Sequence, residues 1–317
     1  MEKLNFYDFQ PKPANFHDEV IRGLSQPQKG IAPKFFYDKR GSELFDRICE
    51  VEEYYPTRTE VSLLQQYSRE IAQLVGENVL LIEYGSGNSS KVRILLDAFA
   101  KPAAYMPIDI SKEHMMQATA ELAQSYPDLN IVAVCADYTQ DFSLPATAAR
   151  KRFIFFPGST IGNLEPTAAV NLLQKACQKL TSGDAMLVGA DLKKDSKRLE
   201  AAYNDAEGVT AAFNLNLLTR INRELQGNFD LNAFKHYAFY NPEFGRIEMH
   251  LKSLENQKVQ IGDREFSFDK GETIHTESSY KYSPEEFQEL ARKAGFVPSK
   301  VWTDSERLFS LHYLNVP

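Results

Sequence analysis

A regular alternation of short apolar runs and helical segments over residues 80–190 constrains the fold more than any other feature of this sequence. Residues 79–82, 104–110, 130–134, 152–156 and 185–190 have the length and apolar composition of buried parallel strands. Between them, residues 89–100, 114–125 and 167–180 carry apolar side chains at helical spacing. Strands that alternate with helices form a parallel sheet covered on both faces, so the sequence predicts an α/β fold.

The pattern changes after residue 192. Residues 193–224 predict one or two helices, and residues 236–282 predict short antiparallel strands separated by turns at 262–263 and 269–271. A helix at 284–294 and strands at 296–302 and 308–314 can return to the first sheet as a closing hairpin. Residues 193–282 are therefore expected to form an α+β insertion in the first domain.

Charge and cysteine content narrow the classes of function. The chain has 317 residues and a net charge of −7, which disfavours nucleic acid as a partner. Three widely spaced cysteines indicate a reducing compartment, and the six histidines show no HxxxH or HExxH spacing, so no metal site is expected. We see no signal peptide and no membrane-spanning run, so we expect a cytoplasmic protein.

Three successive strand ends carry residues suited to a nucleoside. Gly85, Ser86 and Gly87 follow the first strand, and the acidic residue before them favours an S-adenosylmethionine (SAM) site over a pyrophosphate site. Asp109 ends the next strand, where a carboxylate can accept hydrogen bonds from both ribose hydroxyls. Asp137 can accept the adenine amino group, and Tyr138 offers a stacking face. The alternatives are an ordinary strand–helix turn at the glycines and a helix cap at Asp109.

A fourth polar loop, residues 155–164, follows the next strand. It puts backbone carbonyls and the amide of Asn163 beside the expected methyl donor. It is not the Asn/Asp-Pro-Pro-Tyr signature of many methyltransferases that act on nucleic-acid amino groups, which again disfavours DNA or RNA. The alternative is a structural loop in which Asn163 caps a helix.

These motifs lie within a wider resemblance that spans nearly the whole chain beyond residue 30. The matching segments are PKFFYD at 33–38, GSELFD at 41–46, EYYPTRTE at 53–60, the glycine loop, residues 158–164, AYND at 202–205, GVTAAFN at 208–214, RIEM at 246–249 and TESSYK at 276–281. In these segments the chain resembles the histidine-specific methyltransferase family that makes hercynine, histidine trimethylbetaine, on the route to ergothioneine. It departs from the family in ordinary substitutions, such as Tyr84 and Pro157.

The resemblance implies a Rossmann-like, class I SAM-dependent methyltransferase sheet with an inserted α+β substrate-binding domain. Residues 59–192, completed by 283–317, would bind SAM, and residues 1–58 with 193–282 would bind the amino acid. The expected cofactor-binding residues are Tyr37, Gly85, Ser86, Gly87, Lys91, Asp109, Asp137 and Tyr138.

The resemblance also implies roles for individual substrate-binding residues. Asn163 and Tyr203 resemble the residues that bind the carboxylate, and Glu277 and Ser279 resemble the pair that reads the imidazole. Tyr54 would lie beside the ring, Gly158 and Thr160 near the amine, and Met249 in the pocket wall. Tyr37 resembles the tyrosine near the amine and the donor, so it is the expected catalytic residue. Without the resemblance, Glu277 reads as a surface carboxylate and Tyr54 as a core aromatic.

The expected reaction is therefore trimethylation of the α-amino group of L-histidine by a monomeric enzyme. The first alternative is the same fold acting on another amino acid, such as tryptophan. A nicotinamide-dependent oxidoreductase is a second, although the glycine fingerprint for a dinucleotide is incomplete. A regulatory module that binds SAM without catalysis is a third.

Overall fold

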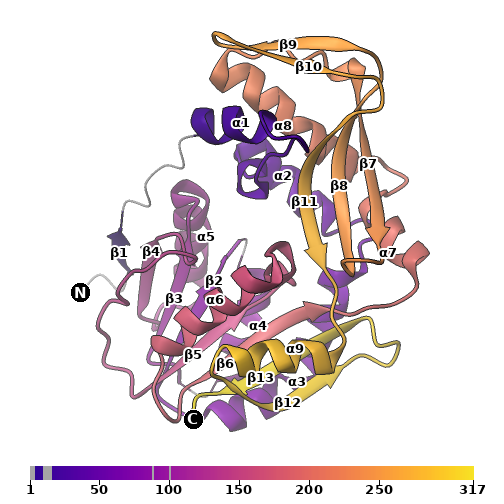
Figure 1. The fold of residues 1–317 in the computed structure, drawn as a ribbon. Helices are drawn as coiled ribbons and strands as arrows, with labels where there is room; N and C mark the ends of the chain where they lie inside the picture. The colour runs from indigo at the N-terminus through magenta and orange to yellow at the C-terminus, as the bar shows by residue number, and fades with distance from the viewer. Residues whose placement is uncertain (1–3, 10–15, 88, 100) are drawn as a thin grey trace. The chain divides into compact units, whose positions relative to one another are not determined.

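The computed structural model describes residues 4–9, 16–87, 89–99 and 101–317 (Figure 1). The chain divides into two compact units, each built from separate stretches of sequence. The first unit consists of Met1–Pro11, Pro56–Lys193 and Tyr282–Pro317, and the second of Lys12–Tyr55 and Lys194–Lys281.

The first unit is built on one eight-stranded sheet. In sheet order its strands are β1 (Leu4–Asp8), β4 (Ile131–Cys135), β3 (Ala104–Asp109), β2 (Val79–Tyr84), β5 (Lys151–Phe156), β6 (Ala185–Asp191), β13 (Phe309–Asn315) and β12 (Val297–Thr303). Strands β1 to β6 pair in parallel, whereas β13 pairs antiparallel to β6 and to β12. The expected parallel sheet and its closing hairpin are confirmed, and the fold is the Rossmann-like one of class I methyltransferases.

Chain order along the sheet reverses between β2 and β5. The chain moves outward from β2 through β3 to β4, then returns to the other side of β2 for β5 and β6. In open parallel sheets, ligands bind outside the carboxyl ends of the strands at such a reversal. All six residues of β2 are buried, as the continuous apolar run predicted.

The helices of the first unit cover this sheet. They are α3 (Tyr55–Val75), α4 (Ser90–Ala98), α5 (Lys112–Ser125), η2 (Thr160–Asn163), α6 (Pro166–Gln178) and α9 (Pro284–Lys293). Local sequence explains where α9 begins, because Ser283 and Glu286 form a reciprocal capping box and Pro284 occupies the first turn. Apolar side chains of α3 and α4 pack with β2 and β5 in one core that includes Leu64, Leu95, Leu81 and Phe153.

Strand β1 differs from expectation. We expected residues 1–58 to belong with the insertion, but Leu4–Asp8 pairs in parallel with β4 and lies in the first unit. Its side chains are mostly exposed, as befits an edge strand. Residues 1–3 and 10–15 of that stretch lie outside the described residues.

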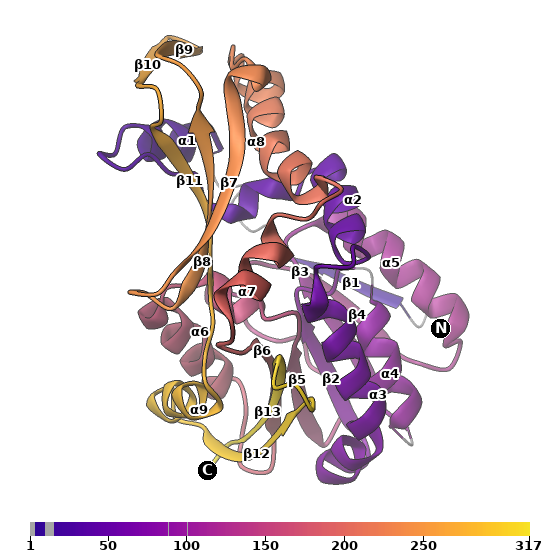
Figure 2. The same ribbon diagram turned by 90° about the vertical axis from the view of Figure 1, so that its right-hand side faces the viewer.

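The second unit combines helices with two small antiparallel sheets. Its helices are α1 (Phe16–Leu24), η1 (Pro33–Phe36), α2 (Lys39–Ile48), α7 (Ser196–Tyr203), α8 (Val209–Leu225) and η3 (Leu231–Ala233). Its strands are β7 (Phe234–Asn241), β8 (Arg246–Ser253), β9 (Gln257–Ile261), β10 (Arg264–Phe268) and β11 (Thr273–Tyr280). Figure 2 shows α8 beside the sheet of order β11-β8-β7. A register shift between His275 and Glu277 interrupts the pairing of β11 with β8.

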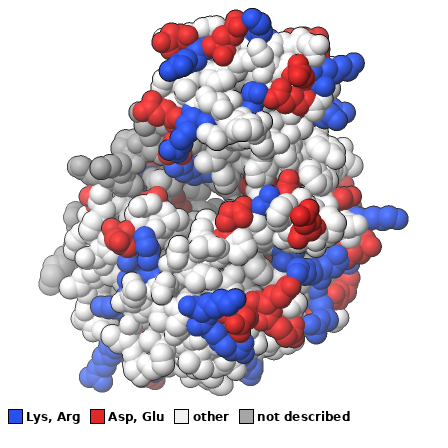
Figure 3. Space-filling model, viewed as in Figure 1, with Lys and Arg blue, Asp and Glu red and all other residues white. Residues whose placement is uncertain are grey.

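Acidic and basic side chains are intermixed on the one face of the molecule that Figure 3 shows. The face seen in Figure 3 shows both signs interspersed over each unit, which differs from the continuous basic stripe of a nucleic-acid groove. Among the described residues, none of the helices combines the length and apolar character needed to cross a bilayer.

A histidine in the core of the first unit makes stability depend on pH. His312 of β13 is fully buried, and its ring centroid lies 4.3 Å from that of Phe287. Burial lowers the pKa of His312 to about 3. Because this is below the pKa of about 6.5 for an unfolded histidine, the unfolded state binds the extra proton between these values. The contribution of this group to the free energy of unfolding is therefore fully present above pH 6.5 and is lost as the pH falls below that value.

We expect this one group to lower the free energy of unfolding by up to about 1.4 kcal/mol per pH unit below pH 6.5. Denaturant unfolding at pH 7.5, 6 and 5 measures the dependence. A His312→Gln variant, which cannot take up the proton, should show a flatter decline. An unchanged slope in that variant would rule out His312 as a source of acid sensitivity.

Candidate functional site

Polar side chains of the first unit gather at the carboxyl ends of β4, β3, β2 and β5, which are neighbours in the sheet. Ten of the predicted site residues belong to this unit: Gly85, Ser86, Gly87, Lys91, Asp109, Asp137, Tyr138, Gly158, Thr160 and Asn163. The six others belong to the second unit: Tyr37, Tyr54, Tyr203, Met249, Glu277 and Ser279. Each unit thus carries a chemically distinct set.

The glycine loop after β2 has the backbone geometry that its sequence predicts. Gly85 and Gly87 have φ values of +71° and +47°, in the region that favours glycine. A Cβ atom at Gly85 would lie 3.9 Å from the Tyr138 ring, so the loop passes close under that side chain. The Ser86 hydroxyl is buried and has no hydrogen-bond partner among the described residues. A buried hydroxyl left in this state is suited to a ligand.

Two carboxylates end the neighbouring strands. Asp109 accepts a hydrogen bond from the backbone N–H of Ser111 at 2.8 Å, and burial raises its pKa. Asp137 accepts bonds from the N–H and the hydroxyl of Thr139, at 2.9 and 2.6 Å. Both side chains are thus oriented by local backbone contacts at the sheet edge, where a nucleoside would need them.

Tyr138 stacks on Tyr84 with ring centroids 5.4 Å apart and an interplanar angle of 7°. The rings of Phe156 and Tyr138 meet edge-on, with their centroids 5.6 Å apart. Tyr84, a departure from the family pattern, therefore supports one face of Tyr138. Stacking of adenine on Tyr138 stays a prediction.

Glu60 is a functional candidate that sequence reasoning missed. This fully buried carboxylate of α3 accepts two contacts from the N–H of Gly158, at 2.9 and 3.0 Å, and one from the Lys91 ammonium at 2.6 Å. It joins the loop after β5 to the first turn of α4. The neighbouring Gly189 is required by this contact, because a Cβ there would lie 2.1 Å from Glu60 Oε1.

Glu83 lies at the same edge, but its chemistry differs from that of Glu60. It accepts a hydrogen bond from the Tyr105 hydroxyl at 2.5 Å, and burial raises its pKa to about 8. Glu83 therefore holds a proton at neutral pH. Lys91 pairs with Glu60, whose Oε2 lies 2.6 Å from the Lys91 ammonium.

The second unit contains a small cavity lined by aromatic and apolar side chains, one threonine and one carboxylate. The lining residues are Phe45, Ile48, Tyr54, Ala202, Tyr203, Thr210, Phe213, Met249 and Glu277. Its volume of about 20 Å³ suits a single water molecule. The side chains that line the cavity must therefore move before an imidazole ring can bind there. The flexible Met249 is the most adaptable of them.

Glu277 is the carboxylate of this cavity and lies opposite Met249 in the β11–β8 pairing. Burial raises its pKa to about 7, while the positive charge of Lys281 opposes the shift. Tyr54 is partly buried, and its ring meets that of Tyr203 edge-on at 6.2 Å. The cavity thus brings together an acidic residue and two tyrosines, the kinds of side chain that were expected in the pocket.

A second polar group adjoins Glu277. The Tyr203 hydroxyl donates to Ser279 Oγ at 2.8 Å, and the Lys281 ammonium donates to both oxygens, at 3.1 and 2.8 Å. Lys281 is buried, yet sequence reasoning did not select it. The alternation of Glu277, Ser279 and Lys281 was a usable signal, because residues two apart in an extended chain share a face.

Tyr37 directly follows η1 and packs against aromatic rings of the same unit. Its ring lies edge-on to Phe45 at 5.7 Å and to Phe213 at 5.9 Å, and both of these phenylalanines line the cavity. Tyr37 also contributes to raising the pKa of Tyr54. It therefore packs against two residues of the cavity wall without lining the cavity itself.

Comparison with known proteins finds relatives that match nearly the whole chain. The sequence model of a family described as "Histidine-specific methyltransferase, SAM-dependent" matches residues 16–316. The histidine N-alpha-methyltransferase of Mycolicibacterium smegmatis is 42% identical over 298 residues, which cover 92% of this chain and 92% of that protein. The protein of the same name from Mycobacterium tuberculosis is 39% identical, with the same coverage of both chains. Among solved structures, a SAM-dependent methyltransferase from Clostridium acetobutylicum aligns with a TM-score of 0.48 and 10% identity, over 80% of this chain and 91% of that one.

Proposed function

The chain belongs to the histidine-specific, SAM-dependent methyltransferase family, and from this premise we propose that it trimethylates the α-amino group of L-histidine to hercynine. This product is the starting point for ergothioneine. The methyl donor is SAM, and the acceptor is a small amino acid.

The observation that carries the choice of histidine is the buried carboxylate of Glu277 in a cavity that is otherwise lined by aromatic and apolar side chains and by Thr210. Imidazole offers an N–H donor and a second ring nitrogen that can accept. Glu277 would accept from the N–H, and Ser279 would serve the other nitrogen. An apolar side chain would leave the carboxylate without a partner, which is costly in a buried pocket.

The residues at the edge of the first sheet fit SAM. The carboxylate of Asp109 would bind the ribose, Asp137 and Tyr138 the adenine, and the loop at Gly85, Ser86 and Gly87 would pass beside the methionine part. The buried hydroxyl of Ser86, which has no hydrogen-bond partner in the described part of the chain, is the strongest single indication of a ligand here. SAM supplies an electrophilic methyl group on a sulfonium centre.

The protein's own part in the reaction is alignment, exclusion of water and removal of a proton from the amine. Tyr203 and Asn163 would bind the substrate carboxylate, and Gly158 and Thr160 would lie near the amine. Tyr37 and an ordered water would relay the amine proton: the phenol oxygen would accept the proton of the amine while its own O–H proton passes to water, so that the amine is neutral before each transfer. Aromatic faces such as that of Tyr54 suit the growing positive charge of the methylated amine.

A Tyr37→Phe variant tests the proton path. We expect kcat to fall by about 10²-fold, within the range for general base catalysis, with little change in the binding of S-adenosylhomocysteine. The ring and its edge contacts with Phe45 and Phe213 would persist in this variant. Unchanged turnover at every pH would remove Tyr37 from the proton path.

The organisation of the enzyme follows from the same proposal. The first unit would bind SAM and the second would bind the amino acid. A monomer suffices for this chemistry, and the free cysteines Cys49, Cys135 and Cys177 suit the cytoplasm.

The proposal is tested by calorimetric titration of histidine with and without S-adenosylhomocysteine, followed by mass spectrometry of a reaction with SAM. Mass gains of one, two and three methyl groups on histidine support trimethylation. Binding of S-adenosylhomocysteine without any binding or methylation of histidine would overturn the choice of substrate.

A further inference from the structure

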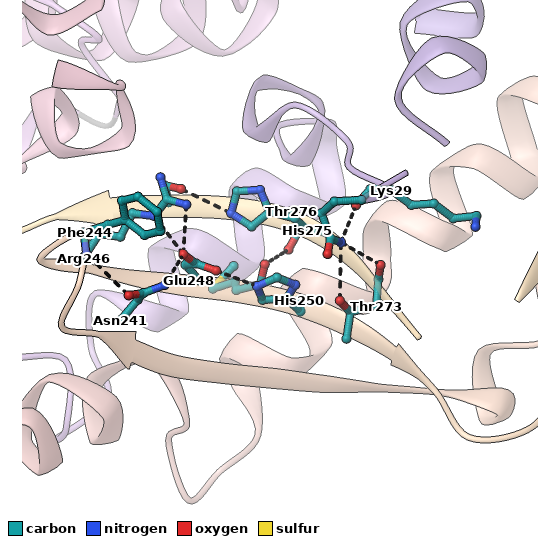
Figure 4. A network of polar contacts seen from close by, with 12 residues as sticks. Lys29, Asn241, Phe244, Arg246, Glu248, His250, Thr273, His275 and Thr276 are labelled. Atoms are coloured by element: carbon teal, nitrogen blue, oxygen red, sulfur yellow. Dashed lines mark hydrogen bonds and ion pairs between the residues drawn. The ribbon is translucent and has the colours of Figure 1, made fainter. Parts of the chain in front are cut away.

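One face of the three-stranded sheet in the second unit carries a compact group of metal-type ligands. Glu248 and His250 are two residues apart on β8, so their side chains point to the same face. His275 lies directly opposite His250 on β11. One ligand atom from each residue can be chosen so that all three lie within 4.8 Å of one another. Figure 4 shows the three side chains along the neighbouring strands.

The two oxygens of Glu248 have separate neighbours. Oε1 accepts hydrogen bonds from the Arg246 guanidinium at 2.9 Å and from the Asn241 amide at 3.0 Å. Oε2 faces His250 Nε2 at 3.0 Å. Arg246 and Asn241 therefore orient the carboxylate and leave its second oxygen turned toward the histidines, as outer partners do for carboxylate ligands in metal sites.

The two imidazole rings lie close together, with ring centroids 5.0 Å apart. A neutral imidazole offers the lone pair of one ring nitrogen to a metal ion. His250 Nδ1 is buried with no hydrogen-bond partner among the described residues, and Phe239 stacks on this ring at 5.6 Å.

We propose that Glu248, His250 and His275 bind one divalent transition-metal ion of the zinc class, with water completing its coordination. Two imidazole nitrogens and one carboxylate oxygen suit Zn²⁺, Co²⁺ or Ni²⁺. Calcium and magnesium prefer oxygen ligands throughout and are not expected. The sequence pattern was missed because we considered only helical spacings such as HxxxH, whereas this set combines an i, i+2 pair with a cross-strand partner.

The site is distinct from the proposed histidine pocket. Met249, which lines that pocket, lies between Glu248 and His250 on β8 and so points to the opposite face. The metal face is open at its rim, where Tyr237 and Phe244 are 42% and 51% exposed. Arg246 weakens the carboxylate as a ligand, because its positive charge lies 2.8 Å from Oε1. We therefore expect a dissociation constant in the micromolar range, about 1–10 µM.

The test is titration of the metal-stripped full-length protein with Co²⁺, followed by visible absorption, and with Zn²⁺ by equilibrium dialysis. The buffer contains no free histidine, because histidine itself chelates these ions. We expect one equivalent to bind with the spectrum of nitrogen and oxygen ligands. His275→Ala should weaken binding at least about 30-fold, and Asn241→Ala about 10-fold, the range expected for an outer partner.

His17→Ala serves as the matched control, because His17 forms an exposed histidine–carboxylate pair with Asp18 at 3.0 Å. It should leave binding unchanged. His275 is only partly buried, so its replacement should leave the fold intact, and circular dichroism in metal-free buffer checks this. A conservative His250→Asn variant provides a second ligand deletion.

Three outcomes would overturn the proposal. These are no saturable binding up to about 1 mM, equal affinity in the wild type and both ligand variants, or a thiolate charge-transfer band that places cobalt on a cysteine. None of these measurements uses methyl transfer, so the metal site and the proposed function stand or fall separately.

Discussion

Replacing Glu277 with alanine is expected to lower kcat/KM for L-histidine by roughly 10²–10³-fold, because the imidazole N–H loses its buried acceptor. The affinity of the variant for an apolar amino acid of similar size, such as L-leucine, should change little or rise, because binding of this ligand no longer removes water from a carboxylate. Steady-state kinetics with histidine and calorimetric binding of both amino acids measure the contrast. Equal losses for the two would show that Glu277 does not read the imidazole.

Two controls separate this loss of specificity from a loss of folding. Glu277→Gln keeps the volume of the side chain, and Glu265→Ala removes an exposed glutamate from the same unit.

The pH dependence of stability gives a further test of Glu277. The pKa of Glu277 is about 7 in the folded protein, above its ordinary value of 4.5. The folded state therefore binds the proton more tightly, and this contribution to stability falls as the pH rises from 4.5 to 7. Glu277→Ala should remove that decline.

The first sheet could be predicted from sequence because its central strands are buried on both faces. In runs such as residues 79–82 every side chain is apolar, because both faces of the strand are buried. The same residues therefore predict both the strand and its burial. The polar edge followed directly, since parallel strands place their carboxyl ends together. Gly85, Asp109 and Asp137 therefore fell at one edge without any knowledge of long-range contacts.

The side-chain partners could not be predicted in the same way. Strand β1 buries little and is defined only by its pairing with β4, so its sequence carries no strong pattern. Glu60 sits in the first turns of a long helix, and its partners Lys91 and Gly158 lie 31 and 98 residues away in sequence. Lys281 became a pocket residue only through its bonds to Tyr203 and Ser279. Such roles depend on tertiary packing, which no local pattern records.

Glu60 is expected to show the largest effect on stability. Alanine at this position would leave the Lys91 ammonium and the Gly158 N–H without their buried acceptor. Loss of one partner from a buried pair costs about 3–5 kcal/mol, which corresponds to a fall in the unfolding temperature of roughly 10 °C. Calorimetry with and without S-adenosylhomocysteine measures this change. A shift below about 2 °C would show that the pair is not important for stability.

A role in positioning requires a measurement that instability alone would not change. Glu60→Gln can still accept from Gly158, but its amide group would face Lys91 as a second donor. Adding Lys91→Met should relieve that conflict, so the double variant should lose less stability than the two single variants together. If Glu60 also positions the loop at Gly158, turnover should stay low in the double variant although its stability recovers.

Gly189→Ala, whose Cβ would lie 2.1 Å from Glu60 Oε1, should displace the same carboxylate without changing any charge. A low kcat in both variants with near-normal binding of S-adenosylhomocysteine would assign Glu60 to alignment of the reacting groups, whereas full turnover in a stable double variant would restrict it to holding the fold together.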